Sequence, residues 1–248
     1  MSLKVLKIKL YQPFANFRKP FSYGIVDSYP LPPPSTVKGW LHNVLGAKNG
    51  EYYEMAVSIS GRFDSTVYDI QKIIKFDRIR KESNPNQILG EYSSTVISSM
   101  VYVTNLIDVE LCIHVNSKPE ILERIQENIY SSFWGLGRKE DLMRLDFIGI
   151  IETKTIDYFG YVQKQLPSYG MYLKQRTAEK FMVDGINFRL NYKYDKTSDN
   201  LRIFKNKKDV VYIDSLNLLE PSLNFDENVL VDDEDILIDL IGDEEYEN

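Results

Sequence analysis

Along the first 152 residues, stretches with the hydrophobic period of a β-strand and stretches with that of an α-helix follow one another in a definite order. This order constrains the fold of the chain more than any other feature. Apolar and polar residues alternate over residues 3–10, 54–60, 101–115 and 145–151, with the period of half-buried β-strands. Two further stretches, 35–45 and 118–133, carry apolar residues at every third or fourth position, as on the buried face of a helix. The sequence therefore predicts the order strand, helix, strand, strand, helix, strand.

Both predicted helices begin at recognisable signals. Prolines 32–34 hold the backbone extended, and Ser35 or Thr36 follows as a candidate N-cap. Gly46 ends the first apolar repeat, as glycine commonly does just after a helix. In the second helix, Pro119 falls in the first turn, where its missing N–H group would have no helical partner anyway.

This order is the βαββαβ pattern of ferredoxin-like α+β folds, a topology shared with RNA-recognition (RRM-like) modules. We therefore predict a ferredoxin-like RNA-binding domain over residues 1–152. Residues 62–100 interrupt it, because a basic, strand-like stretch at 72–81 precedes a turn at 84–86. They are predicted to form an inserted hairpin, a thumb-like arm.

A smaller β-rich region is predicted over residues 153–225. Within it, alternation over residues 188–194 and the strand-like residues 201–204 indicate a hairpin. Residues 226–248 contain eleven acidic residues and no basic one, so they are predicted to form a solvated acidic tail. Without them the chain has 25 acidic and 30 basic residues, a net charge of +5 that suits a nucleic-acid-binding body.

The sequence argues against several classes of protein. No apolar run is long enough to span a bilayer, and the N-terminus does not resemble a signal peptide. Cys112 is the only cysteine, which suits a reducing cytoplasm and excludes an intramolecular disulfide. Glycine-rich nucleotide-binding motifs are missing, and His42 and His114 lie too far apart in the sequence for a zinc motif. We therefore expect no metal, no cofactor and no catalytic residue, with both histidines structural.

Three segments are candidate RNA contacts. The loop Gly135–Lys139 combines two glycines, which allow close backbone approach, with two cations that suit phosphate. The inserted arm combines cations with an aromatic ring, as in many sites for single-stranded RNA. The third segment pairs a cation before the proline run with one in the first helical turn. The predicted RNA-binding residues are Arg18, Lys38, Lys75, Phe76, Arg78, Arg80, Gly135, Gly137, Arg138 and Lys139.

Two motifs, found in this order along the chain, resemble those of the fifth family of CRISPR-associated proteins, which belongs to the RAMP superfamily. The first is Pro32 to Gly39 at the start of the first helix, and the second is Gly135 to Glu140 after the second helix. The resemblance covers about residues 1–175. It implies a ferredoxin-like RNA-binding domain with a thumb-like hairpin and a variable C-terminal region.

The resemblance also implies a function and partners. Members of the family cap the five-prime handle of CRISPR RNA (crRNA) in type I interference complexes. They contact the backbone subunit that coats the spacer and the large subunit that recognises target DNA. The expected role is therefore a non-enzymatic RNA-binding subunit of a type I surveillance complex, of the I-B group, in antiviral defence.

Two alternatives stay open. One branch of the family cleaves precursor RNA without a metal, but the Lys-His pair of that branch is missing here, since Val115 and Asn116 follow His114. A metal-independent endoribonuclease could still use a tyrosine–lysine site, since the chain contains 17 tyrosines, or one of the two histidines as the base. The other alternative is an interaction protein without an RNA role, favoured by the overall net charge of -6.

Overall fold

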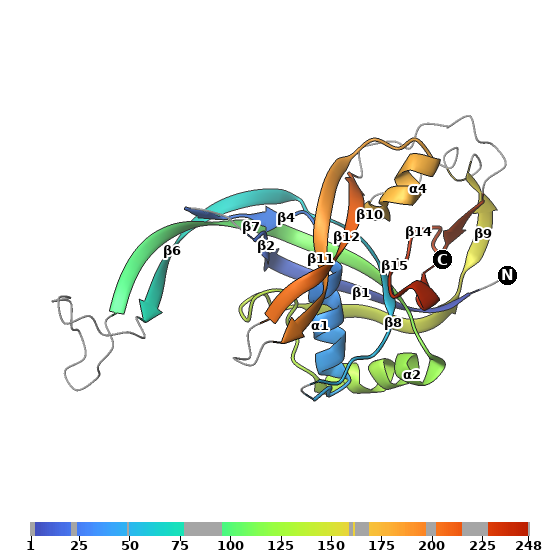
Figure 1. The fold of residues 1–248 in the computed structure, drawn as a ribbon, viewed down its shortest axis with the longest axis horizontal. Helices are drawn as coiled ribbons and strands as arrows, with labels where there is room; N and C mark the ends of the chain where they lie inside the picture. The colour runs from blue at the N-terminus through green and yellow to red at the C-terminus, as the bar shows by residue number, and fades with distance from the viewer. Residues whose placement is uncertain are drawn as a thin grey trace.

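The computed structural model describes residues 3–20, 24–48, 50–76, 96–158, 161, 169–196, 202–214 and 228–247. It is an α+β structure with a mostly antiparallel sheet and few helices in this part of the chain (Figure 1). No helix among these residues is long and apolar enough to cross a membrane.

The first half of the chain contains every element predicted there. The strands are β1 (Lys4–Ala15), β5 (Ala56–Arg62), β7 (Val96–Asn116) and β8 (Arg144–Glu152). Short strands β2 (Phe17–Arg18), β3 (Ile25–Val26) and β4 (Ser28–Tyr29) lie between β1 and the first helix. The helices are α1 (Pro34–Val44) and α2 (Pro119–Asn128), and α2 continues into the 3-10 helix η1 (Ile129–Ser131).

The helix ends differ slightly from the prediction. Pro33 occupies the N-cap of α1 and Pro34 its first turn, so neither Ser35 nor Thr36 is the cap. Gly46 adopts a φ of +67° just after α1, in the left-handed region that favours glycine, as predicted. The regular part of α2 ends at Asn128, short of the predicted end at residue 133.

The four long strands of this half are neighbours in the order β8-β1-β7-β5, and every adjacent pair is antiparallel. Alternate residues of β1, such as Leu6 and Ile8, point into the main hydrophobic core together with Leu41 of α1 and Ile125 of α2. Both helices therefore cover the same face of the sheet. The opposite face carries Lys7 and its neighbours.

Strand β6 (Ser65–Phe76) pairs with the N-terminal half of β7, from Ser65 opposite Ile107 to Phe76 opposite Val96. This antiparallel pair extends away from the body as a curved arm (Figure 1). It lies where the inserted hairpin is predicted, and residues 77–95 between its strands lie outside the described part of the chain.

The region after β8 joins the main sheet. Its described residues include β9 (Lys154–Asp157), β10 (Gly170–Lys174), α4 (Gln175–Lys180), β11 (Ile186–Lys196) and β12 (Arg202–Ile213). Strands β11 and β12 form the predicted hairpin. Strand β10 pairs with both β12 and β5, which extends the sheet to the order β11-β12-β10-β5-β7-β1-β8. The β-rich region therefore continues the first sheet.

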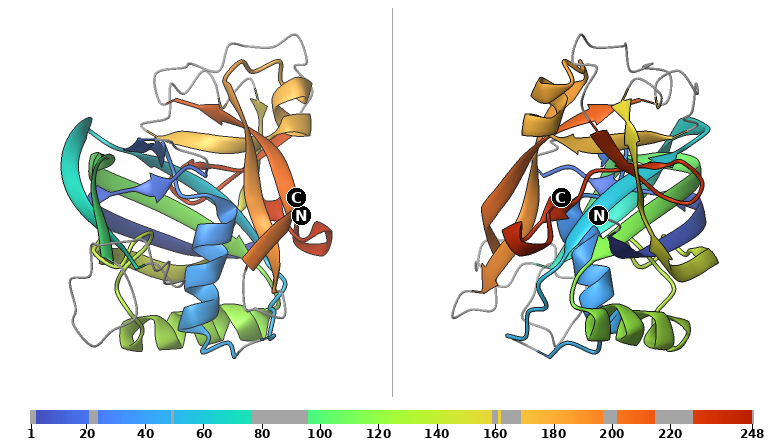
Figure 2. Two further views of the ribbon diagram at one scale, coloured as in Figure 1. Left: turned by 60° about the vertical axis from the view of Figure 1, so that its left-hand side comes forward. Right: turned by 90° about the vertical axis from the view of Figure 1, so that its right-hand side faces the viewer.

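The acidic C-terminal segment differs most from the prediction. Its described residues form β13 (Asn228–Val231), β14 (Leu237–Ile238), β15 (Ile241–Gly242) and the 3-10 helix η2 (Glu244–Tyr246). β13 pairs with β9, and β15 pairs with β5. The acidic residues are interspersed with apolar ones that are buried, and these supply the driving force for folding. The segment crosses the body at the end opposite the arm, where both termini lie (Figure 2).

Candidate nucleic-acid interface

The glycine-rich loop is a tight turn between η1 and β8. Gly135 and Leu142 form an isolated antiparallel bridge, and the Leu136 N–H donates to the Asp141 carbonyl at 3.2 Å. Gly137 has a φ of +108°, and a Cβ there would lie 2.8 Å from Oδ2 of Asp141. Glycine is therefore required at position 137 both by the backbone conformation and by the space.

A buried carboxylate organises this loop. Asp141 accepts hydrogen bonds from the backbone N–H groups of Asn16 at 3.2 Å and Arg138 at 2.8 Å. It also pairs with the Arg138 guanidinium at 2.6 Å, and that guanidinium donates to Asn105 of β7 at 2.9 Å. Arg138, predicted as an RNA contact, therefore mainly makes bonds within the protein. Together with Asp141 it connects the loop to the end of β1 and to β7 at the base of the arm.

The groups that face outward from the loop suit an anion. Within the described residues, the N–H groups of Gly137 and Lys139 donate no hydrogen bond, and the Lys139 side chain is exposed. A Cβ on Gly137 would approach the Asn16 carbonyl and the Phe17 ring, so the junction of β1 and β2 lies against the loop. The exposed Arg18 comes one residue later. The structure thus brings Gly137 and Lys139 to one edge beside the junction of β1 and β2, and Arg18 is the next residue along β2.

Lys38 does not fit the predicted phosphate contact. It lies in α1, but its side chain is buried and pairs with Asp243 of the C-terminal segment at 3.0 Å. Its Nζ atom also donates to the hydroxyls of Tyr52 and Tyr192. Lys38 therefore connects α1 to β11 and to the C-terminal segment. The sequence pattern did not show this, because its partners come from distant parts of the chain.

Burial gives this Lys38 cluster unusual acid–base properties. Burial lowers the pKa of Lys38 to about 8, although the nearby Asp243 carboxylate opposes the shift. The pKa of Tyr52 is raised, mainly by burial and also by its hydrogen bond to Asp243. Burial also lowers the pKa of His42, whose ring lies 5.3 Å from the Tyr52 ring. At neutral pH the cluster combines an easily deprotonated amine with protonated tyrosines.

The arm carries an exposed apolar stripe that the sequence analysis did not identify. Tyr68, Ile70, Met100 and Tyr102 are each more than half exposed, and strand register places them on one face, where Ile70 is opposite Tyr102. Exposed Lys72 lies opposite Met100 on the same face.

The predicted arm contacts are only partly placed. Lys75 and Phe76 belong to β6, but the structure describes only their backbone. Arg78 and Arg80 lie outside the described residues.

The helix-free face of the sheet is occupied by the C-terminal segment. Lys7 of β1, fully buried, pairs with Asp232 at 2.7 Å and with Asp233 at 2.8 Å. Lys9 pairs with Glu234 at 2.8 Å. The acidic turn after β13 thus neutralises both lysines, so neither is available to bind a nucleic acid on this face.

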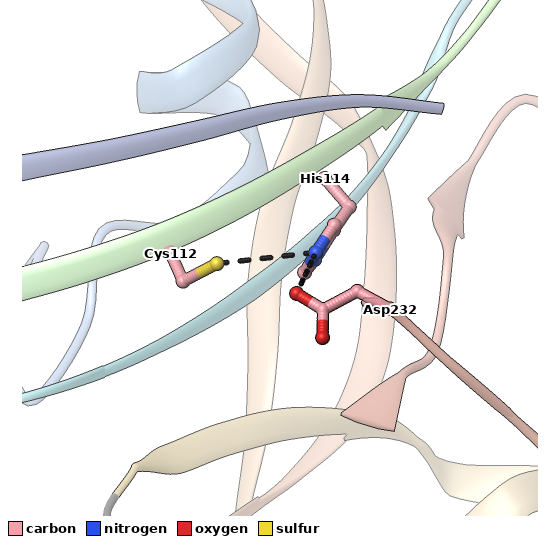
Figure 3. A group of neighbouring side chains, drawn as sticks. All are labelled: Cys112, His114 and Asp232. Carbon is pink, nitrogen blue, oxygen red and sulfur yellow. Dashed lines mark hydrogen bonds and ion pairs between the residues drawn. The ribbon is translucent and has the colours of Figure 1, made fainter. Parts of the chain in front are cut away.

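His114 and Cys112 lie beside this ion pair, and with Asp232 they form a buried group of three metal-ligand residue types (Figure 3). His114 Nε2 lies 3.1 Å from Asp232 Oδ2 and 3.9 Å from the Cys112 sulfur. Burial raises the pKa of Cys112 to about 12 and lowers that of His114. The Lys7 ammonium contacts the same Asp232 oxygen and repels a second cation. The group therefore fits a structural network better than a metal site.

Comparison with known proteins agrees with this architecture. The model of the CRISPR-associated protein (Cas_Cas5) family matches residues 5–213. No curated protein matches the chain. A chain of a solved "CRISPR RNA-guided surveillance complex" is similar with a TM-score of 0.52 and 13% identity, covering 85% of this chain and 89% of that one. This likeness shows a shared fold.

Two other solved structures have lower TM-scores. A structure described as "Crystal structure of Cas protein" has a TM-score of 0.42 and 12% identity, covering 89% of this chain and 98% of that chain. A CRISPR protein from Archaeoglobus fulgidus has a TM-score of 0.37 and 11% identity, covering 85% of this chain and 84% of that chain.

Proposed function

This chain belongs to the CRISPR-associated protein (Cas_Cas5) family, and from that premise we propose that it is an RNA-binding subunit of a type I CRISPR surveillance complex. In this proposal it binds the five-prime handle of crRNA, supports assembly of the complex for antiviral defence, and acts in the cytoplasm without catalysing a reaction.

The observation that carries the proposal is the outward edge of the glycine-rich loop, beside the junction of β1 and β2. The N–H groups of Gly137 and Lys139 have no partner in the described part of the chain, and the exposed Lys139 side chain adds a cation to them. Backbone N–H groups and cations are the main protein contacts of a sugar-phosphate backbone. The buried Asp141 fixes this loop before RNA arrives, which reduces the entropy lost on binding.

The topology supports the same proposal. The order β8-β1-β7-β5, with α1 and α2 on one face, is the arrangement that we interpret as a ferredoxin-like core. Its helix-free face, where RNA-recognition modules stack bases, is covered here by Asp232 and its neighbours. In this protein we therefore place RNA at the loop edge.

The arm is the proposed contact with other subunits. Its stripe exposes large apolar side chains on a strand pair that projects from the body, which is typical of a surface buried in an assembly. We assign it to the spacer-coating backbone subunit, and the large target-recognising subunit remains a proposed partner.

Photo-crosslinking tests the handle contact directly. Repeat-containing RNA with 4-thiouridine at successive handle positions is irradiated with the protein, and the modified peptides are identified by mass spectrometry. The proposal expects crosslinks in the peptides that contain Arg18 and residues 135–142. Crosslinks confined to other surfaces would contradict it.

The Lys38 cluster favours one second candidate, a metal-independent endoribonuclease. The partly exposed Tyr52 hydroxyl, protonated at neutral pH, can donate a proton to a leaving oxygen. The buried Lys38, which donates a hydrogen bond to that hydroxyl and has a pKa of about 8, can then return a proton to Tyr52. Incubation of precursor RNA with the protein in EDTA tests this activity. Specific cleavage that is lost in Tyr52→Phe but kept in the control Tyr194→Phe would support it, and intact RNA would exclude it.

A further inference from the structure

Large apolar side chains are exposed directly beside the glycine-rich loop. Phe133 is 51% exposed, Leu142 is 55% exposed and Tyr130 is 62% exposed. None of the three belongs to a predicted RNA-binding motif. Exposing apolar side chains of this size within thirteen residues of chain is unfavourable in water, so a partner that covers them would gain free energy.

The local backbone holds these side chains in place. The Phe133 ring lies against the backbone of Gly135, where a Cβ would come within 2.4 Å of its Cε1 atom. Gly135 in turn forms the bridge with Leu142, so Phe133 and Leu142 flank one glycine. Trp134 packs against the main core, and its carbonyl oxygen accepts a hydrogen bond from the Met143 N–H at 3.1 Å. The centroid of its ring lies 6.3 Å from that of the Tyr130 ring. These contacts within the chain therefore set the positions of Phe133 and Leu142.

We propose that Phe133 and Leu142, separated by Gly135, form a platform on which one unpaired nucleobase of the bound RNA stacks. This proposal rests on the proposed function, because it needs RNA at the glycine-rich loop. It adds a base contact to a surface that otherwise recognises only phosphate.

The position of the platform favours a nucleotide over an apolar segment of a protein partner. Lys139 is three residues from Leu142, so their Cα atoms are at most about 11 Å apart. A single nucleotide presents a flat apolar base and a phosphate charge within such a distance. The platform and the free N–H groups of the loop match these two parts, whereas a purely apolar protein segment would leave Lys139 and the N–H groups unpaired.

Fluorescence of 2-aminopurine tests the stacking. The probe is placed at each handle position of repeat-containing RNA, and the RNA is titrated with wild-type protein, Phe133→Ala, Phe133→Tyr and the control Tyr194→Ala. We expect one position to be quenched by wild type and by Phe133→Tyr. Phe133→Ala should lose that quenching and bind about 5- to 150-fold more weakly, which corresponds to the loss of one base–aromatic stack.

A second variant moves the ring without removing it. In Gly135→Ala the new Cβ displaces the exposed Phe133 ring, so the quenching should fall although the phenylalanine remains. Circular dichroism of each variant establishes that it is folded.

The outcomes separate the platform from the proposed function. If wild type binds the RNA but no position is quenched, or if Phe133→Ala binds as tightly as wild type, the platform proposal is overturned and the proposed function stands. If Phe133→Ala keeps RNA binding but loses assembly with other subunits, the platform is a protein contact instead. If wild type shows no preference for handle RNA, the proposed function itself fails.

Discussion

The Nζ atom of Lys7 lies 2.7 Å from Oδ2 of Asp232, and both side chains are completely buried. The pair joins the first strand of the sheet to the acidic segment near the end of the chain. Burial alone would lower the pKa of Lys7, but its bonds to Asp232 and Asp233 outweigh that effect and raise it. The acidic segment is therefore an integral part of the fold.

Removing one member of this pair should strongly destabilise the protein. Asp232→Asn removes the fully buried one of the three carboxylates that contact Lys7, and we expect the free energy of unfolding to fall by about 1–3 kcal/mol. Asp233→Asn is the matched control, since Asp233 is about half exposed, and we expect a loss of at most about 1 kcal/mol. Urea unfolding measures both, and equal small effects would contradict the role of Asp232.

Stability should fall in mild acid because of His114. Burial lowers its pKa, so below about pH 6.5 the unfolded chain binds a proton that the folded protein does not. The contribution is complete above pH 6.5 and is lost as pH falls through the lowered pKa. His42 contributes in the same direction. The contribution of His114 is measured by urea unfolding of wild type and His114→Gln between pH 7 and 5. The free energy of unfolding should depend less steeply on pH in the variant. Equal slopes would argue against a buried neutral His114.

Arg138 and Lys139 should respond differently to mutation despite being adjacent. Arg138→Ala removes the brace of the buried Asp141 and should cost about 1–3 kcal/mol of stability as well as RNA affinity. Lys139→Ala should weaken RNA binding without changing the thermal midpoint, and should reduce the slope of log affinity against log salt by about 1. Binding titrations and thermal melts of both variants check this. A Lys139→Ala protein with unchanged affinity would remove Lys139 from the interface.

One lysine should titrate far below the others. The pKa of Lys38 is lowered to about 8, so its contribution to stability increases as pH rises from about 8 towards the unfolded value near 10.4. NMR titration of protein with 13C-labelled lysine should show one signal with a midpoint near pH 8, missing in Lys38→Arg. If every lysine titrates near pH 10, the burial of Lys38 beside Asp243 is contradicted.

Most of the local structure could be predicted from sequence, because it depends on neighbouring residues. The periodicity of hydrophobic residues predicts β1, α1 and the hairpin of β11 and β12, and Gly46 predicts the end of α1. The pairing of β10 with β5 was not predictable in this way. It depends on contacts between residues more than 100 positions apart, such as Met171 and Ser60.

The candidate site was predicted less completely than the fold. The Gly135–Lys139 loop was found, since glycines next to cations leave a local signal. The internal ion pairs of Lys38 and Arg138 are not predictable from charge alone. Lys38 pairs with Asp243 from a distant part of the chain, and a sequence does not show that Asp141, only three residues from Arg138, is buried. The sequence predicts a solvated tail here because the acidic residues dominate the composition of the segment, although Val229, Val231 and Ile241 are buried in the structure.

The central claim is that this protein recognises the crRNA handle, and a titration of labelled repeat-containing RNA in EDTA at two salt concentrations tests it most directly. The account predicts that the RNA stays intact, is bound in preference to a scrambled sequence, and is bound more weakly at high salt because phosphate contacts release counterions. Equal, salt-insensitive retention of both RNAs would contradict it.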